Sequence, residues 1–337
     1  VDEMKFDFAI GNPPYQEDRQ GNSNTALPVY HQFMEAAYSV SNATELITPA
    51  RFLFNAGRTP KDWNQKMLRD EHFKVMEYEA DASTVFCNTD IKGGVAITYR
   101  DKAKKYGAIK TFTIHEEING VLKKIHPCIE ESGAMSNIAF VASKFNTSNL
   151  FRDYPQYDGH ERRMSSNILE FECFHENRDI DDILIYGIYK GKRYGRFINK
   201  KYVDLTDKQI EQYKIITPKA DGNGSFGDKL TNPEVLKPMT GFTHTFLGVG
   251  SFEREQEVLS ALKYIKTKFA RTLLSVLKIT QDLNADKWKY VPLQDFTDKS
   301  DIDWSVSIAN IDKQLYKKYG LSEEEITFIE NNVKEME

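Results

Sequence analysis

A strand that runs into two consecutive prolines is the feature that most constrains the fold of this 337-residue chain. The segment Phe6–Gly11, FDFAIG, alternates large apolar residues with small or polar ones, which is the period of a β-strand. Gly11 gives the backbone freedom at the bend, and the prolines of Asn12–Tyr15, NPPY, then fix φ and favour an extended backbone. The sequence therefore predicts a stiff corner directly after a strand.

Such a corner suits the binding of a planar exocyclic amine. The Asn12 side-chain oxygen and the Pro13 carbonyl can accept the two hydrogens of the amine and draw its nitrogen towards tetrahedral geometry. Charge that develops on the nitrogen is stabilised by these preorganised dipoles, while the Tyr15 ring can stack on the planar ring that carries the amine. An ordinary proline-rich turn is the alternative interpretation of the same residues.

The segment Phe6–Tyr15 resembles the catalytic motif of amino-group methyltransferases that use S-adenosylmethionine, above all the adenine-N6 DNA methyltransferases. The resemblance implies a flipped adenine in double-stranded DNA as substrate. It also implies S-adenosylmethionine as cofactor and Asn12, Pro13, Pro14 and Tyr15 as catalytic residues. The segment Thr84–Tyr99 resembles a later motif of the family, which makes Phe86 the second base-stacking ring, opposite Tyr15. A core position at a strand edge is the alternative for Phe86.

Length and composition limit the remaining possibilities. A chain of 337 residues predicts about two domains, and its 40% hydrophobic and 28% charged residues are typical of a soluble protein. We predict a cytoplasmic location, because the sequence contains no apolar run of membrane-spanning length and no signal peptide. The three scattered cysteines predict a reducing compartment and no metal site. A net charge of −5 means that any DNA-binding site must be a local patch.

The order of elements predicts an α/β fold. Helices are expected at Val29–Val40 and Lys61–Asp70, and strands at Glu45–Phe54, Phe73–Tyr78 and Val95–Tyr99, the last after a turn or bulge at Gly93-Gly94. On the resemblance, residues 1–130 hold the C-terminal part of a Rossmann-like methyltransferase domain with a partial sheet. Shorter, mixed segments follow, which predict an α+β target-recognition domain at 131–300 and a helical tail at 301–337.

Basic residues cluster in two segments after residue 180. Tyr186–Tyr202 contains six cations, five aromatic residues and no acid, and its Gly191 and Gly195 are expected at turns, so a basic hairpin is predicted. Ser251–Lys278 is expected to form one long helix with a buried face. A solvated surface is the alternative for both segments. The predicted DNA-binding residues are Lys190, Lys192, Arg193, Arg196, Lys200, Lys201, Lys266, Lys268 and Arg271.

Two further segments, Tyr264–Phe296 and Leu315–Glu330, resemble the C-terminal part of large type II restriction–modification proteins, in which a methyltransferase is fused to a target-recognition domain. In the γ-type order of that family a glycine-rich cofactor motif precedes the catalytic turn. Only eleven residues precede Asn12, so the resemblance implies a missing N-terminal region that binds the cofactor and possibly carries a nuclease. The run Phe246–Gly250, FLGVG, would instead imply the permuted β-type order, although the acidic residue expected some 20 positions later is absent from the sequence.

Three functions follow from these patterns. The first is the catalytic and specificity portion of a site-specific adenine-N6 DNA methyltransferase. The second is a DNA-binding specificity module or remnant without catalysis. The third, methylation of a glutamine side chain or of RNA, is disfavoured by the long, separate domain that is expected after Thr98.

Overall fold

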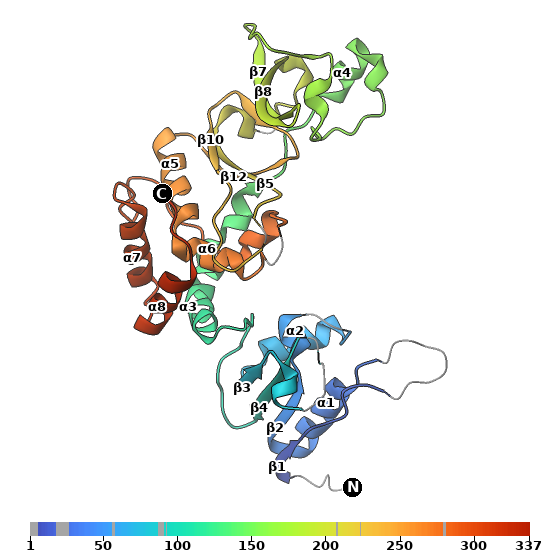
Figure 1. Ribbon diagram of the computed structural model, residues 1–337, viewed down its shortest axis with the longest axis vertical. Helices are drawn as coiled ribbons and strands as arrows, with labels where there is room; N and C mark the ends of the chain where they lie inside the picture. Colours follow the sequence, from blue (N-terminus) through green and yellow to red (C-terminus); the bar gives the residue numbers. More distant parts are fainter. Residues whose placement is uncertain are drawn as a thin grey trace. The chain divides into compact units, whose positions relative to one another are not determined.

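The chain folds into two compact units, Val1–Asn119 and Gly120–Glu337, shown in the computed structural model of Figure 1. The division falls within α3 (Glu116–Ser132). The domain boundary predicted from the sequence follows residue 130, near the end of the same helix. The helices after residue 301 belong to the second unit. The structure describes residues 6–17, 27–55, 58–86, 91, 93–206, 208–222, 224–278 and 281–337.

A four-stranded sheet organises the N-terminal unit. Its strands are arranged in the order β1 (Phe6–Gly11), β2 (Ser41–Pro49), β4 (Val95–Asp101) and β3 (Phe73–Glu79). β1 is parallel to β2, whereas β4 is antiparallel to both of its neighbours. The predicted strands at the start of the chain and near residues 73 and 95 are confirmed, as is the mixed α/β character.

The predicted strand Glu45–Phe54 is too long. β2 ends at Pro49, which has no N–H to continue the ladder, and Ala50–Phe54 forms a 3₁₀ helix. The turn predicted before β4 is confirmed. Gly94 has a φ of +72°, and a side chain there would place its Cβ 2.3 Å from the Glu79 carbonyl oxygen.

Helices cover one face of this sheet. α1 (Tyr30–Val40) and α2 (Lys61–Arg69), both predicted, bury residues such as Met34 and Met67 against strand residues such as Phe73. On the opposite face, β1 exposes three large side chains: Phe6 is 50%, Phe8 55% and Ile10 76% accessible. β1 is also an edge strand, so among the described residues its second edge is unpaired.

The C-terminal unit contains two four-stranded sheets, in the orders β10-β9-β12-β5 and β11-β7-β8-β6. Among the strand pairs that the described residues of this unit form, β11–β7 is parallel and the others are antiparallel. The sheets pack around buried aromatic and branched side chains, among them Phe242 and Ile185. The strands are β5 (Ala139–Phe140), β6 (Phe174–His175), β7 (Asp182–Tyr189), β8 (Lys192–Asn199), β9 (Tyr213–Pro218), β10 (Glu234–Leu236), β11 (Thr240–Phe242) and β12 (Phe246–Phe252).

The single long helix predicted for Ser251–Lys278 is wrong. Its first residues belong to β12, and the remainder divides into α5 (Glu255–Lys266) and α6 (Lys268–Ser275). Thr267 separates the two helices because its backbone is extended and its side chain accepts the Ala270 N–H, which caps α6. Periodic apolar residues continue across this break and hide it from sequence inspection.

α4 (Thr147–Asp153) lies within Lys144–Arg163, and its N-terminus is capped by the Asn146 side chain. One expectation for the hairpin is wrong. Gly195 lies inside β8 opposite Tyr186 rather than at a turn, and the Leu184 side chain occupies the space that a Cβ would need. None of the helices among the described residues is both long and apolar enough to cross a membrane.

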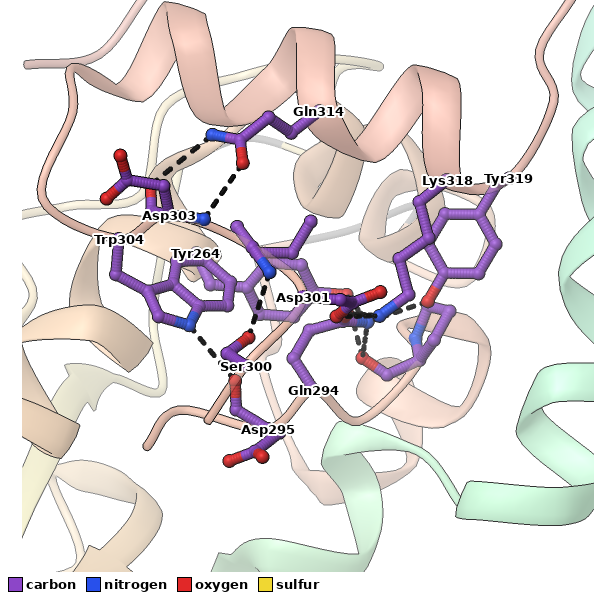
Figure 2. Close-up of polar contacts among 12 residues, drawn as sticks. Tyr264, Gln294, Asp295, Ser300, Asp301, Asp303, Trp304, Gln314, Lys318 and Tyr319 are labelled. Carbon is purple, nitrogen blue, oxygen red and sulfur yellow. Dashed lines mark hydrogen bonds and ion pairs between the residues drawn. The ribbon is translucent and has the colours of Figure 1, made fainter. Parts of the chain in front are cut away.

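The last part of the chain is joined to α5 by a dense polar network (Figure 2). α7 (Ile308–Lys318) places Lys318 Nζ 3.0 Å from the Gln294 side-chain oxygen, while the Gln294 amide donates to Tyr319 Oη at 2.7 Å. The Trp304 indole donates to the Asp295 carbonyl at 3.0 Å. α8 (Glu323–Asn332) begins with a capping box formed by Ser322 and Glu325.

Candidate catalytic turn and nucleic-acid interface

The NPPY turn is held at both ends by backbone pairing. Gly11 pairs with Leu46 at the carboxyl end of β1, and Asn12–Tyr15 follows directly. Beyond the turn, the Tyr15 carbonyl accepts the Val29 N–H at 3.2 Å, and Glu17 N donates to the Leu27 carbonyl at 2.9 Å. The turn therefore lies at the carboxyl edge of a parallel strand pair, with Asn12 exposed and Pro13 half-buried.

The two aromatic rings expected to clamp a base are neighbours. The ring centroids of Tyr15 and Phe86 lie 6.3 Å apart at an interplanar angle of 72°. This is an edge-to-face contact rather than an open sandwich, so one ring must rotate before a planar base can stack between them. Sequence reasoning thus identified two residues that folding brings together from positions 71 apart in the chain.

Tyr15 carries a polar group that is not used by the fold. Its hydroxyl is buried and has no hydrogen-bond partner among the described residues. Burial raises the pKa of this phenol, and the nearby Asn12 side chain offsets part of that rise although the two groups do not meet at hydrogen-bonding geometry. A buried hydroxyl without a partner is costly, so the site favours a ligand or a water that pairs with it.

Phe86 is positioned by a short 3₁₀ helix, Ala82–Thr84, that follows β3. The Asp81 side chain caps this helix through the Ser83 N–H and hydroxyl, at 3.0 and 2.7 Å. The Phe86 N–H then donates to the Ala82 carbonyl at 2.8 Å. These local bonds hold the ring at the edge of the sheet where the NPPY turn lies. Cys87, one of the three cysteines, lies outside the described residues.

The second glycine-rich run does not form a cofactor loop. Phe246–Gly250 lies within β12, between β9 and β5 and antiparallel to both, and all five residues are buried. A Cβ on Gly248 would meet the Phe140 ring at 2.5 Å, so this glycine serves close packing. This run therefore does not supply the cofactor motif that the permuted β-type order requires, and these residues do not fit S-adenosylmethionine.

The predicted basic hairpin is confirmed. β7 and β8 pair from Asp182–Asn199 to Tyr189–Lys192, and the turn residues Lys190 and Gly191 both have positive φ, at 49° and 75°. The exposed side chains of Lys190 and Lys192 lie at this turn, with the Lys190 ammonium over the Tyr189 ring.

The other cations of the hairpin are engaged within the protein. Arg193 contacts the Glu234 carboxylate, and Arg196 donates to the carbonyls of Leu169 and Phe174. Ion pairs join Lys200 to Asp181 at 2.6 Å and Lys201 to Asp153 at 2.9 Å. Contact between these four side chains and DNA stays a prediction, and it requires each of them to exchange or share its present partner.

The cations of α5 and α6 also bind within the C-terminal unit. Arg271 is 1% exposed, and its guanidinium donates to the carbonyls of Lys266, Gly227, Asp228 and Lys334. Lys266 Nζ donates to the Glu337 carbonyl at 2.8 Å, and Lys268 Nζ pairs with Glu330 at 2.6 Å. These contacts give Arg271 a structural role and direct both lysines towards the end of the chain.

A group of potential metal ligands lies beside the hairpin. Ligand atoms of His175, Asp179 and Asp182 lie within 4.8 Å of one another. His175 Nε2 is 2.6 Å from Asp182 Oδ2, which also accepts the Asp179 N–H at 2.6 Å. These bonds close the loop that leads into β7 and give the group a structural role.

Sequence reasoning missed a cluster of three basic residues. Arg163 lies in an irregular segment, Lys219 follows β9, and His244 lies between β11 and β12. Their side chains meet because both Arg163 and Lys219 approach the same His244 ring nitrogen. Each residue is isolated in the sequence, and no local pattern marks it.

Comparison with known proteins gives similarity to methylases at the N-terminus. Residues 1–86, which include Asn12–Tyr15 and Phe86, match the family model described as Eco57I restriction-modification methylase. The chain is also 30% identical over 95 residues to an uncharacterized adenine-specific methylase from Mycoplasma pneumoniae (strain ATCC 29342 / M129 / Subtype 1). That alignment covers 27% of this chain and 22% of the relative, so the chain spans less than a quarter of the relative's length.

Proposed function

We propose that the chain is the catalytic-turn and target-recognition portion of a γ-type adenine-N6 DNA methyltransferase from a type II restriction–modification system. The observation that carries the proposal is the meeting of Tyr15 and Phe86 beside Asn12, at the carboxyl end of a parallel strand. This arrangement lies within the segment that is similar to methylases.

In the proposed reaction the turn binds the exocyclic amine of a flipped adenine. The lone pair of this nitrogen is delocalised into the ring, which makes it a poor nucleophile. Asn12 Oδ1 and the Pro13 carbonyl accept its two hydrogens, favour a tetrahedral nitrogen and stabilise the charge that develops on it. The two prolines restrict the backbone of the turn and so fix the position of the Pro13 carbonyl before the base arrives.

The aromatic pair would hold the base once it has left the duplex. Flipping costs a few kcal/mol, and each aromatic contact returns about 1–3 kcal/mol. The unpartnered Tyr15 hydroxyl offers an additional hydrogen bond at the rim of this site. Rotation of one ring away from the present edge-to-face contact would accompany entry of the base.

S-adenosylmethionine is the methyl donor that we propose, and it would supply an electrophilic methyl group. The one glycine-rich run considered for it is buried in β12, so we place the cofactor site on polypeptide outside these 337 residues. Among the described residues the second edge of β1 is unpaired, which supports this placement because parallel strands normally lie in sheets that are covered on both faces. Phe6, Phe8 and Ile10 would pack beneath that addition.

The test is analysis of DNA treated with the full-length protein and S-adenosylmethionine. Mass spectrometry of the digested nucleosides should detect N6-methyldeoxyadenosine. Asn12→Ala should lower the rate at least about 100-fold, because it removes a preorganised charge-stabilising contact, while the affinity for DNA stays unchanged. Asn42→Ala, at an exposed asparagine of β2, is the matched control and should retain full activity. Full activity of Asn12→Ala would refute the assigned role.

A DNA-binding specificity module without catalysis is the second candidate. It is favoured by the absence of a fitting cofactor loop at Phe246–Gly250. Salt-dependent DNA binding without any methyl transfer by the full-length protein would select it over the enzyme.

A further inference from the structure

Three basic side chains converge on one atom in the C-terminal unit. Lys219 Nζ lies 2.7 Å from His244 Nε2, and an Arg163 guanidinium nitrogen lies 3.2 Å from the same atom. A neutral imidazole has one lone pair on Nε2, which can accept one hydrogen bond in good geometry. Two cationic donors therefore compete for a single acceptor.

Nearby carboxylates do not neutralise this cluster. In the part of the chain that the structure describes, Arg163 and Lys219 form no ion pair, and Asp282 and Glu161 act on Lys219 and His244 only as more distant charges. The neighbouring Arg162 is different, because it pairs with Asp204 at 2.7 Å. The hairpin cations Arg193, Lys200 and Lys201 also have acidic partners. The unneutralised charge thus distinguishes the cluster from its surroundings.

Burial and mutual repulsion lower the pKa of two of the three groups. Burial, and then the positive charges of Lys219 and Arg163, lower the pKa of His244, which Glu161 raises. Burial and Arg163 lower the pKa of Lys219, which Asp282 raises. The charge of an anion between the three groups would raise both pKa values, so its binding would favour the protonated form of His244.

The cluster lies next to the predicted recognition hairpin. The backbone of the His244 loop is bonded to β7, because the Thr243 N–H donates to the Tyr186 carbonyl at 2.9 Å. The Phe246 ring, two residues beyond His244, packs against Tyr186 and lies under the Arg193 guanidinium. The His244 loop and the hairpin are therefore direct neighbours within the C-terminal unit.

We propose that Arg163, Lys219 and His244 form a binding site for one backbone phosphate of DNA. Arg163 and Lys219 donate to the phosphate oxygens, and His244 donates as an imidazolium when it is protonated. The site fixes the position of the duplex and reads no base, since phosphate contacts carry no sequence information. This inference rests on the proposed function for its DNA partner.

The experiment is fluorescence anisotropy of a labelled duplex with the full chain at several salt concentrations. The double variant Arg163→Gln/Lys219→Gln should weaken binding on every duplex and reduce the slope of log K against log[salt] by about 1. Lys299→Gln/Lys317→Gln removes the same charge from exposed positions of the same unit and should keep the slope of the wild type. Thermal unfolding of all variants confirms that they are folded.

A second measurement separates the site from the proposed function. NMR of the His244 ring during titration with inorganic phosphate should show a rise in the pKa of this imidazole, which the double variant abolishes. If the wild type binds DNA and the double variant shows the same slope of log K against log[salt] as the wild type, the inference is overturned while the proposed function stands. If His244 responds to phosphate but the wild type binds no DNA, the DNA assignment and the proposed function both fail.

Discussion

The two units of the chain differ in how completely they cover their sheets. The C-terminal unit buries residues on both of its sheets, such as Val249 and Ile185, and the tail helices close it through the Gln294 network. The N-terminal unit buries one face beneath α1 and α2 but leaves three large apolar residues of β1 exposed at a free edge. The N-terminal sheet therefore has one face packed against helices and one apolar face to which additional polypeptide could pack.

We relate this difference in coverage to two functions of the proposed enzyme. In this proposal the closed C-terminal unit recognises DNA, while the open N-terminal unit carries the NPPY turn and needs a complement. The same contrast appears among the cations. Those that the sequence emphasised are largely engaged with acids or carbonyls, and the unneutralised cluster at His244 was invisible in the sequence.

The strongest way to break the comparison is to remove the apolar side chains of β1. Phe8→Ser/Ile10→Ser in the full-length protein should weaken S-adenosylmethionine binding by more than about 100-fold, because burial of each large side chain contributes about 1.5–3 kcal/mol. Calorimetric titration measures the effect. Met76→Ser, at an exposed residue of the opposite edge strand, is the control, and an equal loss there would contradict the special role of β1.

The closed state of the C-terminal unit can be tested at Arg271. Arg271→Met leaves several carbonyls without a donor in the interior, so the free energy of unfolding should fall by roughly 3–5 kcal/mol. The salt dependence of DNA binding by the folded variant should not change. Arg178→Met, at an exposed arginine, should alter stability by less than about 0.5 kcal/mol. A stable Arg271→Met variant with a smaller salt slope would show that the arginine reaches DNA.

The pH dependence of stability should reveal the buried carboxyl group of Asp312. Burial raises its pKa to about 6, although it accepts the Lys268 and Phe269 N–H groups at the start of α6. A pKa above that of the unfolded chain means that the folded state binds the proton more tightly between about pH 4 and 6. The contribution of Asp312 to stability is therefore lost as the pH rises through this range, by at most about 3 kcal/mol.

Denaturant unfolding of wild type and Asp312→Asn checks this prediction. The stability difference between the two proteins should favour the wild type more at pH 4.5 than at pH 7.5. A difference that does not vary with pH would show that Asp312 titrates normally.

The smallest effect is expected at the tip of the hairpin. Lys192→Ala should weaken DNA binding by up to about tenfold on all sequences at low salt, because it removes one exposed charge. Arg193→Ala should act mainly by removing the partly exposed contact with Glu234 and so lower stability as well. Binding assays at matched salt distinguish the two variants, and an unchanged affinity for Lys192→Ala would remove the turn from the interface.

The sequence was most informative where local chemistry decides the structure. Alternation before Asn12 and the turn at Lys190-Gly191 both act over a few positions, and each was located correctly. Errors arose where tertiary packing overrides a local pattern. Thr267 divides a segment whose apolar spacing predicts one continuous helix. The sequence FLGVG resembles a cofactor-binding loop, whereas its glycines allow close packing inside β12. The convergence of Arg163, Lys219 and His244 depends on three separate segments and has no sequence signal.

Calorimetric titration with S-adenosylmethionine tests the central claim most directly, on this 337-residue chain beside the full-length protein. We expect S-adenosylmethionine to bind the full-length protein and not the folded chain alone, since the chain alone lacks the polypeptide that is proposed to pack beside β1. Binding of comparable affinity to the isolated chain would place a complete cofactor site within these residues and contradict the division proposed for the two parts.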